Sequence, residues 1–161
     1  MITATVFRAA GVVLLLSATA CGGISNPASP PSDFSSGNFA MNIVASNTCS
    51  TLADAGRNRG WRLNLVKTGS SVIGYMQGWS DKATVSSQTT LAGTANGSSL
   101  SLTGSIYDTV AGCAEALCYR AEGTITATQS GNVINGTLNG VLTYEFTTCS
   151  ATDHKVTFTR E

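Results

Sequence analysis

The chain has 161 residues and no net charge, because nine Lys and Arg balance nine Asp and Glu, and it contains one His. A neutral chain lacks the positive potential on which nucleic-acid binding depends, and one His cannot build a multi-histidine metal site. Hydrophobic residues make up 42% of the chain, which excludes wholesale disorder, and the length fits one domain.

Residues 1–20 have the order of a secretory signal peptide. Residues 1–8 are weakly positive, residues 9–16 (AAGVVLLL) are apolar, and the small residues SATA follow at 17–20. The apolar run is far shorter than the roughly 20 residues that a membrane-spanning helix needs. The segment is therefore predicted to direct export rather than to span a membrane.

Cys21 follows this segment, and Ala18-Thr19-Ala20-Cys21 resembles the lipobox of bacterial lipoproteins, with Ala18 where that family usually has Leu. The resemblance implies that Cys21 is acylated and begins the mature chain. Because Gly22 replaces the Asp that retains such proteins in the inner membrane, it also implies an outer-membrane protein facing the periplasm. Removing Cys21 leaves four cysteines, an even set for an exported protein. The alternative is cleavage after Ala20 and secretion of a soluble protein.

Residues 21–38 are predicted to be the acylated N-terminus and a flexible linker. The stretch 22–38 contains all three Pro of the chain and is otherwise mostly Gly, Ser and Asn. This composition buries too little apolar surface to become ordered, so we expect the domain to stand off the bilayer. The alternative is an extended arm packed on the domain, in which Phe34 makes the contact.

Residues 39–161 are predicted to form one domain of eight or nine strands. Apolar and polar residues alternate in successive runs, which predicts strands with one buried and one solvated face. The apolar positions are Phe39, Met41, Ile43 and Ala45; Trp61, Leu63 and Leu65; Val72, Gly74, Met76 and Gly78; Leu91, Gly93 and Ala95; Leu100, Leu102, Gly104 and Ile106; Tyr119, Ala121, Gly123, Ile125 and Ala127; Ile134, Gly136 and Leu138; Leu142, Tyr144 and Phe146; and Val156 and Phe158.

Hairpin turns are predicted between these runs at residues 68–71 (TGSS), 96–99 (NGSS) and 130–132 (SGN), with a fourth at Asn139-Gly140. Gly in such pairs supplies the positive φ that tight hairpins need. Glycines also recur on the apolar faces of successive strands, where they favour strong coiling and closure of the sheet. We therefore expect an all-β, antiparallel up-and-down barrel, with a two-sheet β-sandwich as the alternative.

The meandering hairpins, the repeated x-Gly-x positions and a final strand beside the first resemble the small barrels of the lipocalin and avidin superfamily. This resemblance covers residues 39–161 and implies a small closed barrel. No ligand motif of either family can be carried over to residues of this chain.

Four cysteines remain for two disulfides in an oxidising compartment. Cys113 and Cys118 bracket four residues and are predicted to close a local loop. Cys49 follows the first predicted strand and Cys149 ends the eighth, and these ends are neighbours in a closed barrel, so Cys49–Cys149 is the second predicted pair. The other two pairings stay open. A metal site is disfavoured because no second Cys pair or His cluster accompanies Cys-x4-Cys.

No catalytic, metal or cofactor site is predicted. His154 is interpreted as a surface residue in a charged loop before the last strand, between Asp153 and Lys155. Glu122 and Glu145 are assigned to outer faces, as cross-strand partners of Arg120. Because no acid or base is assigned to the inner face, an enzyme is not expected.

A binding protein is expected instead. The inner-face residues Trp61, Tyr119, Tyr144 and Phe146 are candidate ligand contacts; the alternative is that they simply fill the core. Residues 50–60 (STLADAGRNRG) are predicted to form a helical turn capped by Ser50 or Thr51.

Arg57 and Arg59 of that segment are placed over the barrel mouth, where they would hold an anionic ligand; the alternative is a solvated loop. The expected function is that of a membrane-tethered, non-catalytic lipoprotein of the cell envelope that binds a small apolar or amphipathic ligand. The alternative is an envelope-protein-binding lipoprotein, such as an inhibitor of a wall hydrolase or protease, using loops or the exposed aromatic residues Tyr75 and Trp79.

Overall fold

The computed structural model describes residues 33–76, 88–89, 91–108 and 119–161. The signal segment, Cys21, Trp79, Cys113 and Cys118 lie outside the described residues. The elements of the described part are β1 (Gly37–Val44), α1 (Asp54–Arg57), β2 (Asn58–Thr68), β3 (Ser71–Met76), β4 (Gln88–Thr89), β5 (Leu91–Asn96), β6 (Ser99–Asp108), β7 (Tyr119–Ser130), β8 (Val133–Tyr144) and β9 (Thr147–Arg160).

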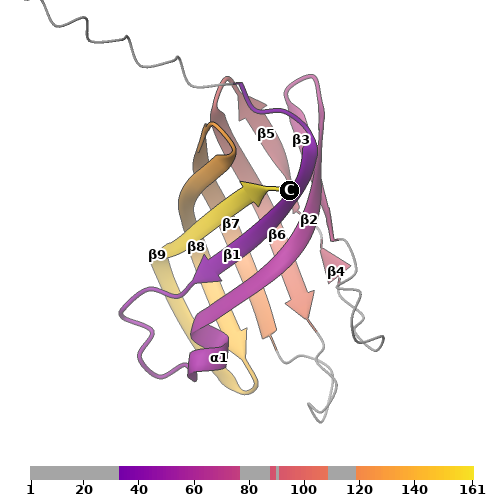
Figure 1. The fold of residues 1–161 in the computed structure, drawn as a ribbon. Coiled ribbons are helices and arrows are strands. Elements are labelled where there is room, and N and C mark those ends of the chain that lie inside the picture. The colour runs from indigo at the N-terminus through magenta and orange to yellow at the C-terminus, as the bar shows by residue number, and fades with distance from the viewer. Residues whose placement is uncertain (1–32, 77–87, 90, 109–118) are drawn as a thin grey trace, which may run out of the picture.

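Eight of the described strands form a closed antiparallel barrel (Figure 1). Each barrel strand pairs with the next along the chain, and β9 pairs with β1. The two-residue strand β4 is not one of the eight barrel strands, and it pairs with β6. The expected up-and-down barrel is therefore confirmed, and the β-sandwich alternative is wrong.

The inner faces of the strands meet in one hydrophobic cluster. In β2, for example, the side chains of Trp61, Leu63 and Leu65 are buried. Arg62, which lies between Trp61 and Leu63, and Val66, which follows Leu65, are exposed. This alternation follows from the pleat, which directs successive side chains to opposite faces of a sheet. The predicted inner positions of the other strands are likewise buried or partly buried in the described residues, with the exception of Phe146.

Three of the four predicted hairpin turns are present. Gly69, Gly97 and Gly131 adopt φ values of 62°, 56° and 60° at the turns between β2 and β3, β5 and β6, and β7 and β8. Such values are accessible to Gly without steric cost.

The fourth predicted turn, at Asn139-Gly140, is wrong. The strand β8 continues through both residues, and its register against β9 shifts between Leu138 and Gly140. The turn instead lies at Glu145 and Phe146, where Glu145 has a φ of 53°. Phe146 is therefore 96% exposed at the tip of a hairpin and does not belong to the inner face.

A row of glycines crosses three neighbouring strands. Gly104 of β6 pairs with Gly123 of β7, which pairs with Gly140 of β8. A Cβ atom on Gly123 would lie 2.2 Å from the carbonyl oxygen of Asn139, and one on Gly140 would lie 2.0 Å from that of Glu122. The strands approach closely enough here to exclude any side chain, as the inward glycines of the sequence suggested.

The segment before β1 packs on the end of the barrel that carries the turns at Gly69, Gly97 and Gly131. Phe34 is 2% exposed, stacks on Phe39 with ring centroids 6.3 Å apart, and donates its backbone N–H to the Gly97 carbonyl. Arg160 donates hydrogen bonds to the carbonyls of Ser35 and Ser36. The described end of the predicted linker is therefore a packed arm, and the ordered domain begins before residue 39.

The opposite end of the barrel is occupied by the connection between β1 and β2 (Figure 1). The helical turn predicted within residues 50–60 is present, but it is shorter and spans only Asp54–Arg57. Its N-cap is Ala53 without a side-chain hydrogen bond, so the expected cap by Ser50 or Thr51 is wrong. Within the described ranges, no helix has the length and hydropathy needed to cross a membrane.

Candidate ligand-binding site

Two of the predicted ligand contacts meet inside the barrel at its α1 end. Trp61 lies near the start of β2 and Tyr119 is the first residue of β7, and both side chains are buried. Their ring centroids are 5.0 Å apart and the planes are tilted by 51°. Because β2 and β7 are not neighbours in the sheet, this contact crosses the interior of the barrel.

Both aromatic residues carry a buried polar atom that has no hydrogen-bond partner among the described residues. These atoms are Trp61 Nε1 and Tyr119 Oη. Buried polar groups are nearly always paired, and leaving one unpaired costs roughly 1–3 kcal/mol. A water molecule beside each atom would complete its hydrogen bonding.

Arg59 is a charged residue that acts on this pair. Burial raises the pKa of Tyr119 above the usual range, and the Arg59 guanidinium lowers it in part. The Tyr119 hydroxyl therefore keeps its proton and is available as a donor. Arg59 is half-buried in β2, two residues before Trp61, so the predicted basic residue does lie near the aromatic pair.

The helix α1 packs beside this pair through Tyr144. Tyr144 ends β8, is the register partner of Tyr119, and packs against the hydrophobic cluster while partly buried. Gly56 of α1 is buried against it, and a Cβ on Gly56 would lie 2.4 Å from Tyr144 Cβ. Trp61, Tyr119 and Tyr144 are thus gathered at one end, whereas Phe146 is not.

Arg57 ends α1 and is half-buried at the same end of the barrel. Its carbonyl accepts a hydrogen bond from the backbone N–H of Ala45 at 2.7 Å, which closes the connection between β1 and β2 on itself. Arg57 therefore has a defined structural role through its backbone.

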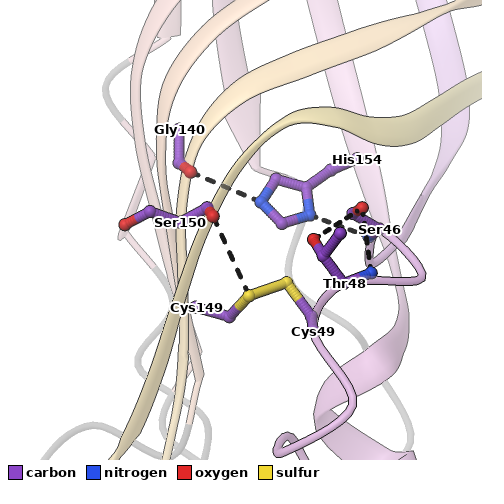
Figure 2. Close-up of a disulfide and its surroundings, with 7 residues drawn as sticks. All are labelled: Ser46, Thr48, Cys49, Gly140, Cys149, Ser150 and His154. Carbon is purple, nitrogen blue, oxygen red and sulfur yellow. Dashed lines mark hydrogen bonds between the residues drawn. A yellow bond between two sulfur atoms is a disulfide. The ribbon is translucent and has the colours of Figure 1, made fainter.

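A disulfide ties this connection to the far end of the chain (Figure 2). The structure joins Cys49 to Cys149, 100 residues apart in sequence, with Cα atoms 5.6 Å apart, which is the pair expected from the sequence. Cys149 lies near the start of β9 rather than at the end of the preceding strand, because the hairpin turn falls at residues 145–146.

His154 is buried beside this disulfide, and its assignment to a surface loop is wrong (Figure 2). It lies within β9 with 0% exposure. Its Nδ1 accepts a hydrogen bond of 3.0 Å from the Ser46 backbone N–H, so the proton resides on Nε2, which faces the Gly140 carbonyl at 3.3 Å. The ring thus joins the connection between β1 and β2 to both strands of the last hairpin.

Acidification should weaken the fold through His154. Burial lowers the pKa of His154 below its ordinary value of about 6.5, against the opposing effects of the Gly140 hydrogen bond and Asp153. Below pH 6.5, His154 binds a proton in the unfolded chain but not in the folded chain. The free energy of unfolding is therefore highest at neutral pH and decreases as the pH falls below 6.5. The slope is at most about 1.4 kcal/mol per pH unit.

Urea denaturation between pH 7.5 and 5.5 measures this effect, and His154 is the only His of the chain. The variant His154→Gln, which lacks a titrating group, should lose the slope over this range. If the free energy of unfolding depends on pH equally in both proteins, or does not depend on pH in the wild type, the pH dependence does not arise from His154.

Replacing Tyr119 with Phe should stabilise the ligand-free protein. The ring and its packing remain, whereas the buried hydroxyl without a partner is removed, so the free energy of unfolding should rise by about 1 kcal/mol. Urea denaturation measures the change, with the 53% exposed Tyr75 replaced by Phe as a control that should stay within about 0.5 kcal/mol. A loss of stability in Tyr119→Phe would show that the hydroxyl has a partner.

Of the three charged residues assigned to outer faces, Arg120 and Glu122 lie on the outer face of β7, whereas Glu145 does not lie in a strand. Arg120 and Glu122 form an ion pair on β7, and the Arg120 guanidinium also lies 5.0 Å from the centre of the Tyr107 ring. Glu145 is in the last hairpin turn and takes no part in this strand pairing. In the described ranges, no group of three or more His, Cys, Asp or Glu is placed to hold a metal ion.

Exposed apolar residues gather on the outer face of β2 and β3. Val66 and Ile73 are register partners with exposures of 39% and 46%, and Tyr75 in the same strand is 53% exposed. Tyr75 therefore faces solvent as expected. We refer to Val66, Ile73 and Tyr75 as the outer patch.

Sequence patterns missed two residues of this end, His154 and Gly56. His154 shares its parity with the inward residues Val156 and Phe158, so extending that alternation upstream would have found it. Gly56 carried no comparable signal, because its role depends on the contact between α1 and Tyr144. No protein-family model matches the chain, and no curated protein or solved structure is significantly similar to it.

Proposed function

We propose that the protein is a membrane-tethered, non-catalytic lipoprotein of the bacterial cell envelope that binds a small amphipathic molecule at the α1 end of its barrel. The observation that carries the binding function is the pair of buried polar atoms, Trp61 Nε1 and Tyr119 Oη, which lack partners among the described residues. Small-molecule sites combine apolar walls with a few well-placed polar groups, which is the composition found here.

A non-catalytic role is supported by the bonding of His154. Both of its ring nitrogens face backbone groups, those of Ser46 and Gly140. Proton transfer to a substrate requires a nitrogen within hydrogen-bond reach of that substrate. His154 therefore suits a structural role in the last hairpin rather than acid–base chemistry.

The tether is supported by the sequence around Cys21 and by the even number of cysteines that remains without it. Gly97, Lys67 and Arg160 hold the arm at residues 33–36 against the end of the barrel that carries the turns at Gly69, Gly97 and Gly131. On this proposal the tether leaves the domain beside those turns. The ligand site at the α1 end then faces away from the bilayer.

Mass spectrometry of the protein extracted from membranes tests the tether. We expect a mature chain that begins at Cys21 and carries acyl groups, and we expect Cys21→Ser to release the protein into the soluble fraction. An unmodified mature chain in the wild type would instead establish a secreted soluble protein.

Fluorescence titration tests the binding function. The chain has two Trp, so the variant Trp79→Phe leaves Trp61 as the only reporter. Titration with decanol and, separately, with decanoate should change the Trp61 emission saturably and raise the unfolding temperature. Absence of both effects for both probes up to millimolar concentration would contradict the proposal.

A second candidate function is the binding of another envelope protein through the outer patch. Large apolar side chains grouped on an exposed sheet face are typical of interaction surfaces. Cross-linking in intact envelopes should then capture a partner, and Ile73→Asp combined with Tyr75→Asp should abolish its capture. If the double variant captures the same partner as the wild type, the outer patch is not the contact.

A further inference from the structure

A hydrogen bond that a proton can break ties the connection between β1 and β2 to β9 (Figure 2). The Ser46 backbone N–H donates to Nδ1 of His154 at 3.0 Å, and both residues are buried, with exposures of 4% and 0%. The next N–H groups of the connection bond within it, because Ser46 Oγ accepts from Thr48 and the Ser46 carbonyl accepts from Cys49. Ser46 thus holds this part of the connection to β9.

Protonation affects the two sides of the His154 ring differently. Nδ1 accepts from Ser46, so a proton on Nδ1 would set two donors against each other and break this bond. Nε2 already carries a proton and faces the Gly140 carbonyl at 3.3 Å, where a charged ring donates more strongly than a neutral one. A proton therefore separates the connection from His154, while His154 keeps its bond to β8.

The surroundings of His154 favour the neutral ring as long as the connection is closed. Burial lowers the pKa of His154, against the opposing effects of the Gly140 hydrogen bond and of Asp153 on the same strand. Lys155, the next residue, is exposed on the other face of β9. The connection and β8 meet the ring with uncharged groups, the Ser46 N–H and the Gly140 carbonyl. Opening admits water to the ring and returns its pKa toward about 6.5, so acid favours the opened connection.

The disulfide limits how far a released connection can move. Cys49 follows closely after Ser46 and is joined to Cys149 of the same strand that carries His154. Cys49 is fully buried, and Leu52 beyond it is 3% exposed within the hydrophobic cluster. Residues 45–48 can therefore open between the end of β1 and Cys49, while the apolar part of the connection stays in the core.

We propose that residues 45–48 form an acid-sensitive latch, which opens when a proton on His154 displaces the Ser46 N–H and which the Cys49–Cys149 disulfide keeps from spreading along the connection. The response is confined to the α1 end, because His154 remains hydrogen-bonded to β8 through Gly140. This local opening is distinct from the loss of global stability on acidification, in which the whole barrel unfolds.

Amide hydrogen exchange of the full chain at pH 7.5 and 5.5, corrected for intrinsic exchange rates, tests the latch. At pH 5.5 the opened state holds about ten protonated rings for each neutral one, so the opening constant at the Ser46 amide should rise up to about ten-fold. The Phe34 amide, bonded to the Gly97 carbonyl at the other end of the barrel, is the internal control and should keep its opening constant.

The dependence on urea separates the latch from global unfolding. Low concentrations of urea should leave the opening constant at Ser46 unaltered, because a local opening exposes little surface. An opening constant at Ser46 that is the same at both pH values would overturn the latch. So would an opening constant that increases with urea as steeply as those of the core amides of β7 and β8.

Two variants assign the response to its parts. His154→Gln, whose side chain does not titrate, should remove the pH dependence at Ser46. Cys49→Ala combined with Cys149→Ala should extend the acid response to residues 50–57, whose opening constants should stay unchanged in the wild type. A ten-fold response that persists in His154→Gln, or one that already covers residues 50–57 in the wild type, would overturn the proposal. If His154→Gln does not fold, the pH and urea dependences of the wild type decide.

Discussion

Replacing Gly123 with alanine is expected to destabilise the barrel by at least about 3 kcal/mol, enough to unfold a domain of ordinary stability under mild conditions. Gly123 has a φ of 148°, which residues with a side chain rarely adopt. The added Cβ would also lie 2.2 Å from the Asn139 oxygen and 2.7 Å from Gly140 Cα. These are backbone atoms of β8, so relief requires the two strands to separate and lose hydrogen bonds.

Gly60→Ala is the matched control for this prediction. Gly60 also lies in a barrel strand, but its Cβ would meet the Met41 oxygen at 3.5 Å, which is ordinary contact. The free energy of unfolding of the Gly60→Ala variant should therefore differ from that of the wild type by less than about 1 kcal/mol. Urea denaturation followed by circular dichroism compares the two variants. Equal stability of Gly123→Ala and Gly60→Ala would contradict the close approach of β7 and β8.

Removing the Cys49–Cys149 disulfide is expected to cost about 2–5 kcal/mol of stability. The bond closes a loop of 100 residues, and in the chain-entropy model such a loop is worth up to about 4.7 kcal/mol through restriction of the unfolded chain. The double variant Cys49→Ala with Cys149→Ala avoids leaving a hydroxyl at position 49, where the side chain is fully buried. Urea denaturation of the double variant and of the oxidised wild type gives the difference.

The location of the loss provides a second readout. Since the disulfide holds the connection between β1 and β2 on β9, amide hydrogen exchange should quicken most in residues 45–57. Exchange at the hairpin turns near Gly69 and Gly97 should change little, because these lie at the opposite end of the barrel. A uniform increase over both ends, or a stability loss below about 1 kcal/mol, would contradict the role assigned to this bond.

Much of the barrel could be predicted from local patterns. The inward positions of Trp61, Leu63 and Leu65 follow from the two-residue period of a strand, and Gly69, Gly97 and Gly131 follow from the conformational needs of tight turns. These features depend on neighbours in sequence, so the chain itself displays them. The glycines on the apolar faces predicted closure of the barrel, because residues without a side chain allow adjacent strands to approach closely.

The last hairpin could not be predicted in the same way. Asn139-Gly140 is the stronger local turn signal, but pairing with β9 carries β8 through it to Tyr144. The actual turn uses Glu145 at positive φ, a conformation that Glu seldom adopts. Between the pairs Leu138–His154 and Gly140–Ala151, β9 contains one more residue than β8. This bulge reverses the alternation, so Ala151 and His154 both face the core.

The candidate site was only partly visible in the sequence. Alternation placed Trp61 and Tyr119 on the inner face, but their contact depends on how strands on opposite walls are staggered. The packed arm was similarly hidden. Phe34 stands in a polar stretch, and its partners include Phe39 and the distant Gly97. The composition of residues 21–38 predicts a linker, because amino-acid composition contains no information about long-range contacts such as those of Phe34.

The indole N–H resonance of Trp61 gives the most direct test of ligand binding at the α1 end. In 15N-labelled Trp79→Phe protein, titration with decanoate should shift this single indole signal downfield as Nε1 gains an acceptor, together with backbone amides at the starts of β2 and β7. An indole signal that stays in place while amides of the outer patch shift would contradict the site and favour binding at Val66, Ile73 and Tyr75.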